Sequence, residues 1–393
     1  MFLFNKYRSG LQSNTTGDKI IVVRWKRFLN SNPTFAAEST AVIDSDGNFY
    51  FGTHSGNFYS LDKFGNIRWS FYTTKKIYSS PVIIDDRVCF MGGDGVCYYL
   101  NTLDGRIIWK YDLKKGYWDS NKQRIWNTFL YLPYTFNLKR KSNMDTKSWT
   151  SPLVINNLIL VTGFGKGLYA INNNGEIVWD YDMGFPRYQL TGLVADENNN
   201  LYCISRSCFA TALDLKGNVL WKTKLKMNWH PWGNPSFNIN NRNIYFVLSK
   251  GEKNGCIIAL NNLGKKLWET KLQGAIHGSV TIDKKGDFLY CADFEGYIYK
   301  IDAKTGNIVS LKKISTATRA LWTTPTIDIE NYVYISTKDS FSKGRVIKLD
   351  QNLNIIWEFH SNKTLSVPLI LENGDVCFGS WDGYYYCLQT KER

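Results

Sequence analysis

The chain has 393 residues and a net charge of +14 at pH 7, with 44% hydrophobic and 21% charged residues. This composition is typical of a globular protein and excludes a disordered or fibrous chain. No stretch is apolar over the length of a membrane-spanning helix, and the first residues hold only a short apolar run, 1–4, below the length of a signal-peptide core. We therefore expect a cytoplasmic protein with no membrane span.

The first predicted strand, residues 20–28, carries Trp25 and has no partner nearby in the sequence. A complete unit follows at residues 39–69. Its first strand is 39–44, and the segment DGNFYFGTHSGNFYSLDKFGNIRW then forms three more strands separated by tight turns. Four short antiparallel strands cannot bury both of their faces alone, so the unit must stack against neighbours of its own kind.

Later units share a turn and strand end of the form Asp-x-x-Gly-x-x-x-Trp, with Asn replacing Asp in some copies. Glycine suits the turn because it adopts positive φ, and the tryptophan ends the next strand. The copies are Asp62/Gly65/Trp69, Asn101/Gly105/Trp109 with one extra turn residue, Asn172/Gly175/Trp179, Asp214/Gly217/Trp221 and Asn261/Gly264/Trp268. Two degenerate copies, from which we expect weaker joints between blades, are Asp302/Gly306/Ser310 and Asp350/Leu353/Trp357.

The two ends of the chain complete one another. The last unit, GDVCFGSWDGYYYCLQTKER, stops after its third strand, while residues 20–28 form an outer strand without a unit of its own. Pairing 20–28 with 384–389 closes a ring and removes two exposed sheet edges. We predict an all-β fold: an eight-bladed β-propeller of four-stranded antiparallel blades, closed by the N-terminal strand, as a single domain over residues 1–393.

The positions of the eight cysteines indicate apolar packing rather than a disulfide framework or a metal site. Nearly all fall inside predicted strands, and none forms a Cys-x-x-Cys or adjacent pair, which is typical of reduced thiols in a protein core. Cys203 and Cys208 flank one hairpin and are the best candidates for a disulfide. We expect exposed loop histidines and no metal site, because the four histidines belong to different blades: His54, His230, His277 and His360.

The positive net charge favours an anionic partner but identifies none. Most lysines stand singly on turns and outer strands, and no basic run extends beyond residues 139–141. Nucleic-acid binding is therefore unsupported by the sequence.

Stretches such as YFGTHSGNFYSLDKFGNIRW and CFGSWDGYYYCL resemble the repeat of the pyrroloquinoline-quinone-type, or quinoprotein-like, β-propellers, and the resemblance covers nearly the whole chain. A WD-repeat propeller is disfavoured, because Trp-Asp occurs only at Trp118, Trp179 and Trp381 and no Gly-His precedes any of them at the required distance. The resemblance implies that the tryptophan of each unit docks against the next blade, the role that we expect for Trp25, Trp69, Trp109, Trp179, Trp221, Trp268 and Trp357.

That family includes quinone-dependent alcohol and sugar dehydrogenases as well as non-catalytic members, such as an outer-membrane assembly lipoprotein, so the fold does not assign a function. The quinone enzymes are exported, and many hold the cofactor against a disulfide of adjacent cysteines and bind Ca²⁺ through a carboxylate cluster. This sequence shows no export signal, no adjacent cysteines and no acidic cluster in the corresponding loops. We therefore expect no cofactor.

A candidate site lies where the turns between second and third strands meet the connections between blades, because both leave the same face of the ring. Aligning the innermost strands places one position of each blade at the channel mouth: Glu38, Tyr78, Trp149, Leu190, Trp232, His277, Trp322 and Leu365. Aromatic walls suit a planar or sugar-like ligand, and basic groups in the same loops suit an anionic one. We predict ligand binding by Tyr78, Trp149, Arg187, Tyr188, Trp232, His277, Arg319 and Trp322. The alternative is that the tryptophans plug the channel.

The connection 112–148 between blades 2 and 3 is far longer than the others and rich in Trp, Tyr, Phe, Lys and Arg. Long loops in compact domains are usually functional or disordered, and the aromatic content disfavours disorder. We expect this insertion to cover the channel mouth or contact a protein partner, or else to pack on its own blade.

These observations predict a non-catalytic ligand-binding or protein-interaction propeller with an aromatic site at the channel mouth. The alternative is an enzyme that acts at this mouth, such as a quinone-dependent dehydrogenase. No nucleophile and base stand at a spacing that supports it.

Overall fold

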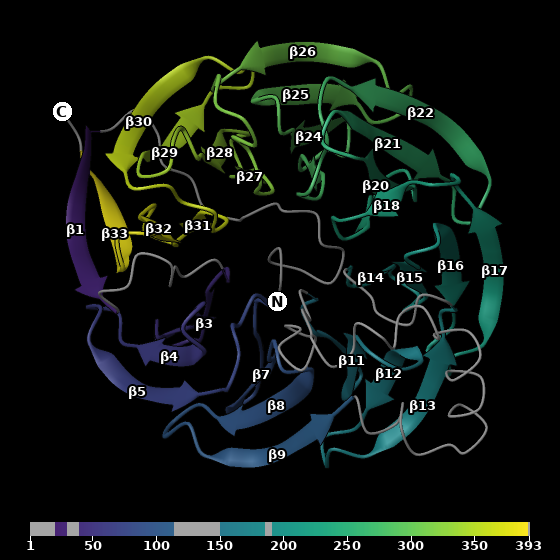
Figure 1. Cartoon of the computed structure of the whole chain (residues 1–393), viewed down its shortest axis with the longest axis horizontal. Helices are drawn as coiled ribbons and strands as arrows, with labels where there is room; N and C mark the ends of the chain where they lie inside the picture. Colours follow the sequence, from purple (N-terminus) through teal and green to yellow (C-terminus); the bar gives the residue numbers. More distant parts are fainter. Residues whose placement is uncertain (1–19, 30–38, 114–149, 185–190, 392–393) are drawn as a thin grey trace, which may run out of the picture.

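The computed structural model describes residues 20–29, 39–113, 150–184 and 191–391, which form eight antiparallel sheets and no helix. The sheets follow one another around a common axis in chain order (Figure 1). The predicted all-β, eight-bladed propeller is thereby confirmed. No helix in this described part is long and apolar enough to cross a membrane. The predicted insertion lies outside the described residues except for its first residues.

Blades are numbered in chain order, and their strands run from the innermost outward. Blade 1 comprises β2 (Val42–Ile43), β3 (Phe49–Gly52), β4 (Asn57–Leu61) and β5 (Ile67–Tyr72). Blade 2 comprises β6 (Val82–Ile84), β7 (Arg87–Met91), β8 (Val96–Asn101) and β9 (Ile107–Asp112). Blade 3 comprises β10 (Leu153–Ile155), β11 (Leu158–Thr162), β12 (Gly167–Ile171) and β13 (Ile177–Asp182). Blade 4 comprises β14 (Val194–Ala195), β15 (Leu201–Ile204), β16 (Phe209–Leu213) and β17 (Val219–Lys224).

The second half of the ring follows the same plan. Blade 5 has a divided innermost strand, β18 (His230–Pro231) and β19 (Ser236–Phe237), then β20 (Ile244–Lys250), β21 (Asn254–Leu260) and β22 (Lys266–Leu272). Blade 6 comprises β23 (Thr281–Ile282), β24 (Phe288–Ala292), β25 (Tyr297–Asp302) and β26 (Ile308–Lys313). Blade 7 comprises β27 (Thr326–Ile327), β28 (Val333–Ser336), β29 (Gly344–Leu349) and β30 (Ile355–Ser361). Blade 8 comprises β31 (Leu369–Ile370), β32 (Val376–Gly379), β33 (Tyr384–Lys391) and β1 (Ile20–Phe28).

Burial falls from the middle of each blade to its outer edge. In blade 1 every residue of β3 is buried, whereas every residue of β5 is exposed or half-buried. Both faces of the inner strands are covered because each blade packs between two neighbours, as in the cluster that joins Val82 of blade 2 to Ile159 of blade 3. The burial that one unit cannot achieve alone is supplied by the next unit.

The outer tryptophans join each blade to the next. A methyl group added to Gly105 would lie 2.6 Å from a carbon of the Trp69 ring, and Trp69 Nε1 donates a hydrogen bond of 2.9 Å to the Thr102 carbonyl oxygen. Glycine is required in this turn because its φ is +73° and because a side chain would overlap the ring. The same contacts join Trp25, Trp109, Trp179, Trp221 and Trp268 to the turns at Gly65, Gly175, Gly217, Gly264 and Gly306.

The two degenerate units compensate one another. Ser310 in β26 stands where the pattern has tryptophan, and the facing turn of blade 7 carries Leu353 where the pattern has glycine. Leu353 is fully buried in the cluster between blades 6 and 7, although its φ of 66° is one that side chains rarely adopt. The bulk absent from one blade is present in the other at this joint, and the weakness expected of the two degenerate joints stays a prediction.

Strand β1 closes the ring as the outermost strand of blade 8. It pairs antiparallel with β33, with Trp25 opposite Cys387. Arg24 forms an ion pair with the buried carboxylate of Asp375 in the same blade, while Trp25 docks on Gly65 of blade 1. The predicted pairing of 20–28 with 384–389 is confirmed, and one strand therefore holds the first and last blades together.

Trp357 is the exception among the docking tryptophans. It packs against the buried cluster between blades 7 and 8, but the outer strands of blade 8, β33 and β1, are not joined by a hairpin turn. Trp357 therefore meets no turn glycine, and its Nε1 has no hydrogen-bond partner among the described residues.

All eight cysteines are buried free thiols. Cys208 Sγ donates to the Trp229 carbonyl oxygen over 2.9 Å, and the disulfide considered between Cys203 and Cys208 is not formed. Burial raises the pKa of Cys203 to about 12, so the reactive thiolate is suppressed at neutral pH. The cysteines serve as small apolar packing groups.

Alanine at a docking glycine tests the joint between blades. In Gly217→Ala the new methyl group would lie 2.8 Å from the Trp179 ring, at a residue whose φ is +86°. We expect the free energy of unfolding to fall by roughly 2–5 kcal/mol, the sum of a left-handed backbone cost of about 1–2 kcal/mol and an overpacking cost of about 1–3 kcal/mol. Denaturant titration measures the change.

Gly184→Ala is the matched control, because Gly184 has a φ of +83° and no atom of the described residues lies within 4 Å of an added Cβ. It should lose only the backbone part, about 1–2 kcal/mol. Equal losses for the two variants would show that the contact with Trp179 does not join the blades.

Removal of β1 tests the closure. Deletion of residues 1–28 exposes the edge of β33 and leaves the Asp375 carboxylate without Arg24, so we expect an aggregating protein. Deletion of residues 1–15 leaves β1 intact and should give soluble protein. Light scattering and yield after purification compare the two, and equal solubility would contradict the role of β1.

Candidate functional site

One face of the ring carries a cavity of about 470 Å³, called here the channel-mouth cavity. Its wall comes from two kinds of segment: turns between second and third strands, such as those holding His54 and Trp381, and connections between blades, such as those holding Tyr78 and Trp322. Both kinds leave the same end of the antiparallel blades. Residues far apart in the sequence therefore meet around the axis.

The predicted site residues that the structure describes lie mostly in this wall. Tyr78, Trp232, His277 and Trp322 all line the cavity, together with Leu365 from the same aligned position. The predicted residues Trp149, Arg187 and Tyr188, and the aligned positions Glu38 and Leu190, lie outside the described residues.

Arg319 stands apart from the cavity. It is exposed, its guanidinium carbon lies 6.0 Å from the centre of the Trp322 ring, and it forms an ion pair with Glu252. Arg319 therefore lies beside the aromatic wall rather than in it, and its charge is already paired.

The wall on the side of blades 5 to 7 is an aromatic stack around His277. The imidazole is stacked on Trp232 at 4.3 Å between ring centres and meets Trp322 edge-on at 5.0 Å, with the buried Phe294 ring 4.3 Å away. Burial in this stack lowers the pKa of His277 to about 3, so the imidazole is neutral at physiological pH. His277 acts here as a flat aromatic group.

The wall on the side of blades 8, 1 and 2 holds a second cluster. The His54 ring is only 5% exposed and lies 4.7 Å from Tyr78 and 5.9 Å from Trp381, both edge-on. The Nζ atom of the buried Lys363 lies over the Trp381 ring, 3.4 Å from its centre. A desolvated ammonium above an indole is stabilised by a cation–π interaction.

Sequence reasoning missed His54, Lys363 and Trp381 as wall residues. The signal was present, because His54, Phe294 and Trp381 each stand two residues before the turn glycine of their own unit. The expectation of exposed histidines is wrong for His54 and His277, which the inner ends of the blades enclose.

The charged residues of the cavity wall are all lysines. Lys76, Lys338 and Lys363 line it, and no aspartate or glutamate stands among the described residues of the lining. The indole N–H groups of Trp322 and Trp381 are buried and have no hydrogen-bond acceptor within the described part of the chain. The cavity thus offers aromatic faces and positive charge, which suits a ligand with anionic groups.

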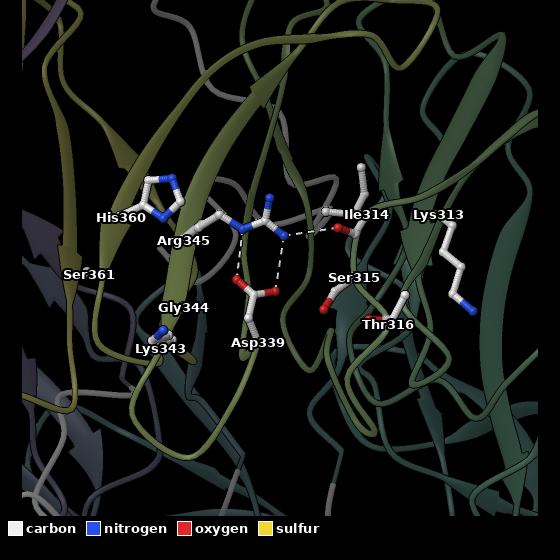
Figure 2. A pocket seen from close by; sticks show the side chains of 10 residues that line it. All are labelled: Lys313, Ile314, Ser315, Thr316, Asp339, Lys343, Gly344, Arg345, His360 and Ser361. Carbon is white, nitrogen blue, oxygen red and sulfur yellow. Dashed lines mark hydrogen bonds and ion pairs between the residues drawn. The ribbon is translucent and has the colours of Figure 1, made fainter.

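A second hollow of about 670 Å³ lies on the same face at blade 7 (Figure 2). Arg345 stands in it and holds Asp339 through two hydrogen bonds, Nε to Oδ2 at 2.8 Å and Nη2 to Oδ1 at 3.1 Å. It also donates to Glu358 and to the Ile314 carbonyl oxygen. Hydrogen bonding to Asp339 raises the pKa of Arg345 above its ordinary value, so this guanidinium is a fixed and satisfied charge.

No group of three or more His, Cys, Asp or Glu side chains is placed to hold a metal ion, as far as the described residues extend. A neutral imidazole with a pKa of about 3 is a weak base at neutral pH, and the cysteine thiols are enclosed in the sheets.

A family model described as outer membrane protein assembly factor BamB matches residues 13–127, 138–309 and 253–376. The chain belongs to this family. The match confirms the resemblance to quinone-type propellers, and its three stretches take in blades from every part of the ring.

Curated relatives carry the same BamB name. The Yersinia pestis protein is 23% identical over 74% of this chain and 67% of its own length. The Shewanella oneidensis protein is 22% identical over 78% of this chain and 70% of its own length. The Kangiella koreensis protein is 27% identical over 41% of this chain, and that match spans only 42% of the relative's length.

Two solved structures share the fold. The crystal structure of BamB from Moraxella catarrhalis aligns with a TM-score of 0.69 and 15% identity over 95% of this chain and 99% of its own. A computationally designed protein aligns with a TM-score of 0.64 and 12% identity over 92% of this chain and 98% of its own. At these identities the likeness shows the fold alone.

The BamB relatives contradict the expectation of a cytoplasmic protein, because they are outer membrane protein assembly factors by name. That expectation rested on the residues at the start of the sequence and on unpaired cysteines. Thiols enclosed in separate strands report packing rather than the redox state of a compartment, so they could not decide the location.

Acidification tests the buried state of His277. Its folded pKa of about 3 lies below the ordinary 6.5, so the unfolded chain takes up a proton first and stability falls as the pH drops from 6.5 toward 3. The slope is at most about 1.4 kcal/mol per pH unit. His277→Phe keeps a flat ring that cannot be protonated. Urea titrations at neutral and mildly acidic pH give the free energy of unfolding of the variant and of the wild type. We expect the variant to become more stable relative to the wild type as the pH falls. A difference that does not change with pH would contradict a neutral His277 in the stack.

Proposed function

We propose that this protein is a non-catalytic propeller that binds a protein partner during the assembly of outer membrane proteins. The observation that carries this proposal is the BamB family match along the ring. The relatives of that name support a site of action at the outer membrane. The rigid ring suits such a role, because closed blades present many loops on a fixed frame.

The finer part of the proposal is a binding site at the channel mouth for a planar, sugar-like or anionic group. Its support is the convergence of Tyr78, Trp232, His277 and Trp322 on one cavity. Plugging by the same rings is less favoured, since about 470 Å³ remains open between them and lies in the range of small-ligand sites, about 300–1,000 Å³. The lysines in the wall favour an anionic group.

An enzyme at the channel mouth is the less supported alternative. A general base must have a pKa near the working pH, and burial holds that of His277 at about 3. A quinone-dependent dehydrogenase would add a cofactor, and we expect added pyrroloquinoline quinone with Ca²⁺ to leave the protein unreactive.

Loss of the protein tests the proposal in the organism that carries it. Deletion of the gene should lower the amount of folded outer membrane proteins, measured as protease-resistant protein in the membrane fraction, and re-expression should restore it. The protein itself should separate with the outer membrane on a density gradient. Unchanged outer membrane proteins after deletion, or a protein found in the cytosolic fraction, would overturn the proposal.

A further inference from the structure

The turn between β28 and β29, residues 337–343, carries a phenylalanine into solvent. Phe341 is 82% exposed, the highest value among the large hydrophobic side chains that the structure describes. On one side of it the turn contributes Lys338 to the channel-mouth cavity, and on the other it contributes Asp339 and Lys343 to the hollow around Arg345. The turn is thus the partition between the two hollows.

This turn is held firmly by its base. Arg345 donates two hydrogen bonds to Asp339, as Figure 2 shows. The Lys338 amide donates to the Ala320 carbonyl oxygen at 2.9 Å. The Thr364 amide donates to the Thr337 carbonyl oxygen from the other side at 3.2 Å. Phe341 is therefore presented to water by an anchored turn.

Lys363 joins Phe341 to the cavity. Its Nζ atom lies 4.6 Å from the centre of the Phe341 ring and 3.4 Å from that of Trp381. The exposed ring, the ammonium and the indole of the cavity wall form one continuous surface. A ligand that touches Phe341 and enters the cavity must be longer than the cavity itself, which indicates a chain segment rather than a small molecule.

The charge of this surface is positive. Lys338, Lys363 and Lys76 line the cavity, and no carboxylate lines it among the described residues. The aspartates next to Lys338 and Trp381 in the sequence already have partners. Asp339 accepts hydrogen bonds from Arg345, and Asp382 accepts hydrogen bonds from the Tyr386 hydroxyl at 2.6 Å and the Tyr384 amide at 3.1 Å. Charge complementarity therefore favours an acidic occupant.

We propose that Phe341, Lys338, Lys363 and Trp381, called here the rim site, bind an acidic segment of a protein partner that carries an aromatic side chain. The aromatic side chain stacks in the cavity, its neighbouring carboxylates pair with the lysines, and the segment crosses Phe341 on its way out. This inference rests on the proposed function, since it assigns the chemistry of the partner that the propeller binds.

Fluorescence anisotropy of short labelled peptides tests the rim site. The probe is acetylated and amidated Asp-Glu-Phe-Asp-Glu, compared with the same peptide with Ala for Phe and with Lys-Lys-Phe-Lys-Lys. We expect the acidic aromatic peptide to bind most tightly at low ionic strength and to weaken as salt is added, because salt screens the lysine–carboxylate pairs. Indole-3-acetate, which has an aromatic ring and a carboxylate but no peptide chain, should bind more weakly than the acidic peptide. Equal binding of the acidic and basic peptides, or tighter binding of indole-3-acetate, would overturn the proposal.

Substitutions place the binding on the rim. Phe341→Ser and Lys338→Gln should each lower the affinity for the acidic peptide by about fivefold, which corresponds to about 1 kcal/mol of binding free energy. The matched controls are Leu263→Ser, at a side chain 76% exposed, and Lys216→Gln, because both lie in turns at the opposite end of the blades. The controls should bind as the wild type does. Melting curves confirm that each variant is folded, and unchanged binding by both rim variants would overturn the rim site.

The double variant Phe341→Ser/Lys338→Gln separates this inference from the proposed function. If gene deletion lowers folded outer membrane proteins and the double variant fails to restore them, both stand. If the double variant restores them fully, the rim site fails while the function holds. If the wild type binds the peptide but deletion has no effect, the function fails and the rim chemistry stands.

Discussion

The contact of a tryptophan ring with the turn glycine of the next blade is the interaction on which the rest of this structure depends. Each of the six indoles in such a contact covers a position where even a methyl group would overlap it, and its N–H is satisfied by a carbonyl oxygen of the same turn. Because every contact joins neighbouring blades, the contacts together fix the rotation between units. At the joint between blades 6 and 7, Ser310 stands at the tryptophan position, and the buried side chain of Leu353 stands where the other turns have glycine.

The fixed rotation between blades creates the channel mouth. Equivalent positions of successive units must face the axis, so residues such as Tyr78, Trp232 and Trp322 converge although they lie far apart in the chain. The enclosure then changes their chemistry. His277 loses its tendency to take up a proton because the stack excludes water, while lysines supply the only charge in the described lining.

The second hollow has a supporting role. Arg345 satisfies two carboxylates and one carbonyl oxygen, so it has little left to offer a ligand. Its effect is to fix the turn that carries Lys338 and Phe341 between the hollows. Within blade 7, a half-buried ion pair thus stabilises an exposed turn, which suits a scaffold that binds partners through its loops.

The sequence by itself determined the number of blades, the strand that closes the ring and most of the described aromatic wall. These follow from local patterns: alternation in strands, glycine where φ is positive, and a repeat whose equivalent positions must meet. It could not determine that His54 is buried, that His277 is packed in an aromatic stack, that Lys363 lies over Trp381, or that Arg319 stands outside the cavity. Only the tertiary structure decided these points, because they depend on which loops of different blades meet at the axis. The cytoplasmic expectation failed for a related reason, since neither a short apolar run nor a buried thiol carries information about the compartment.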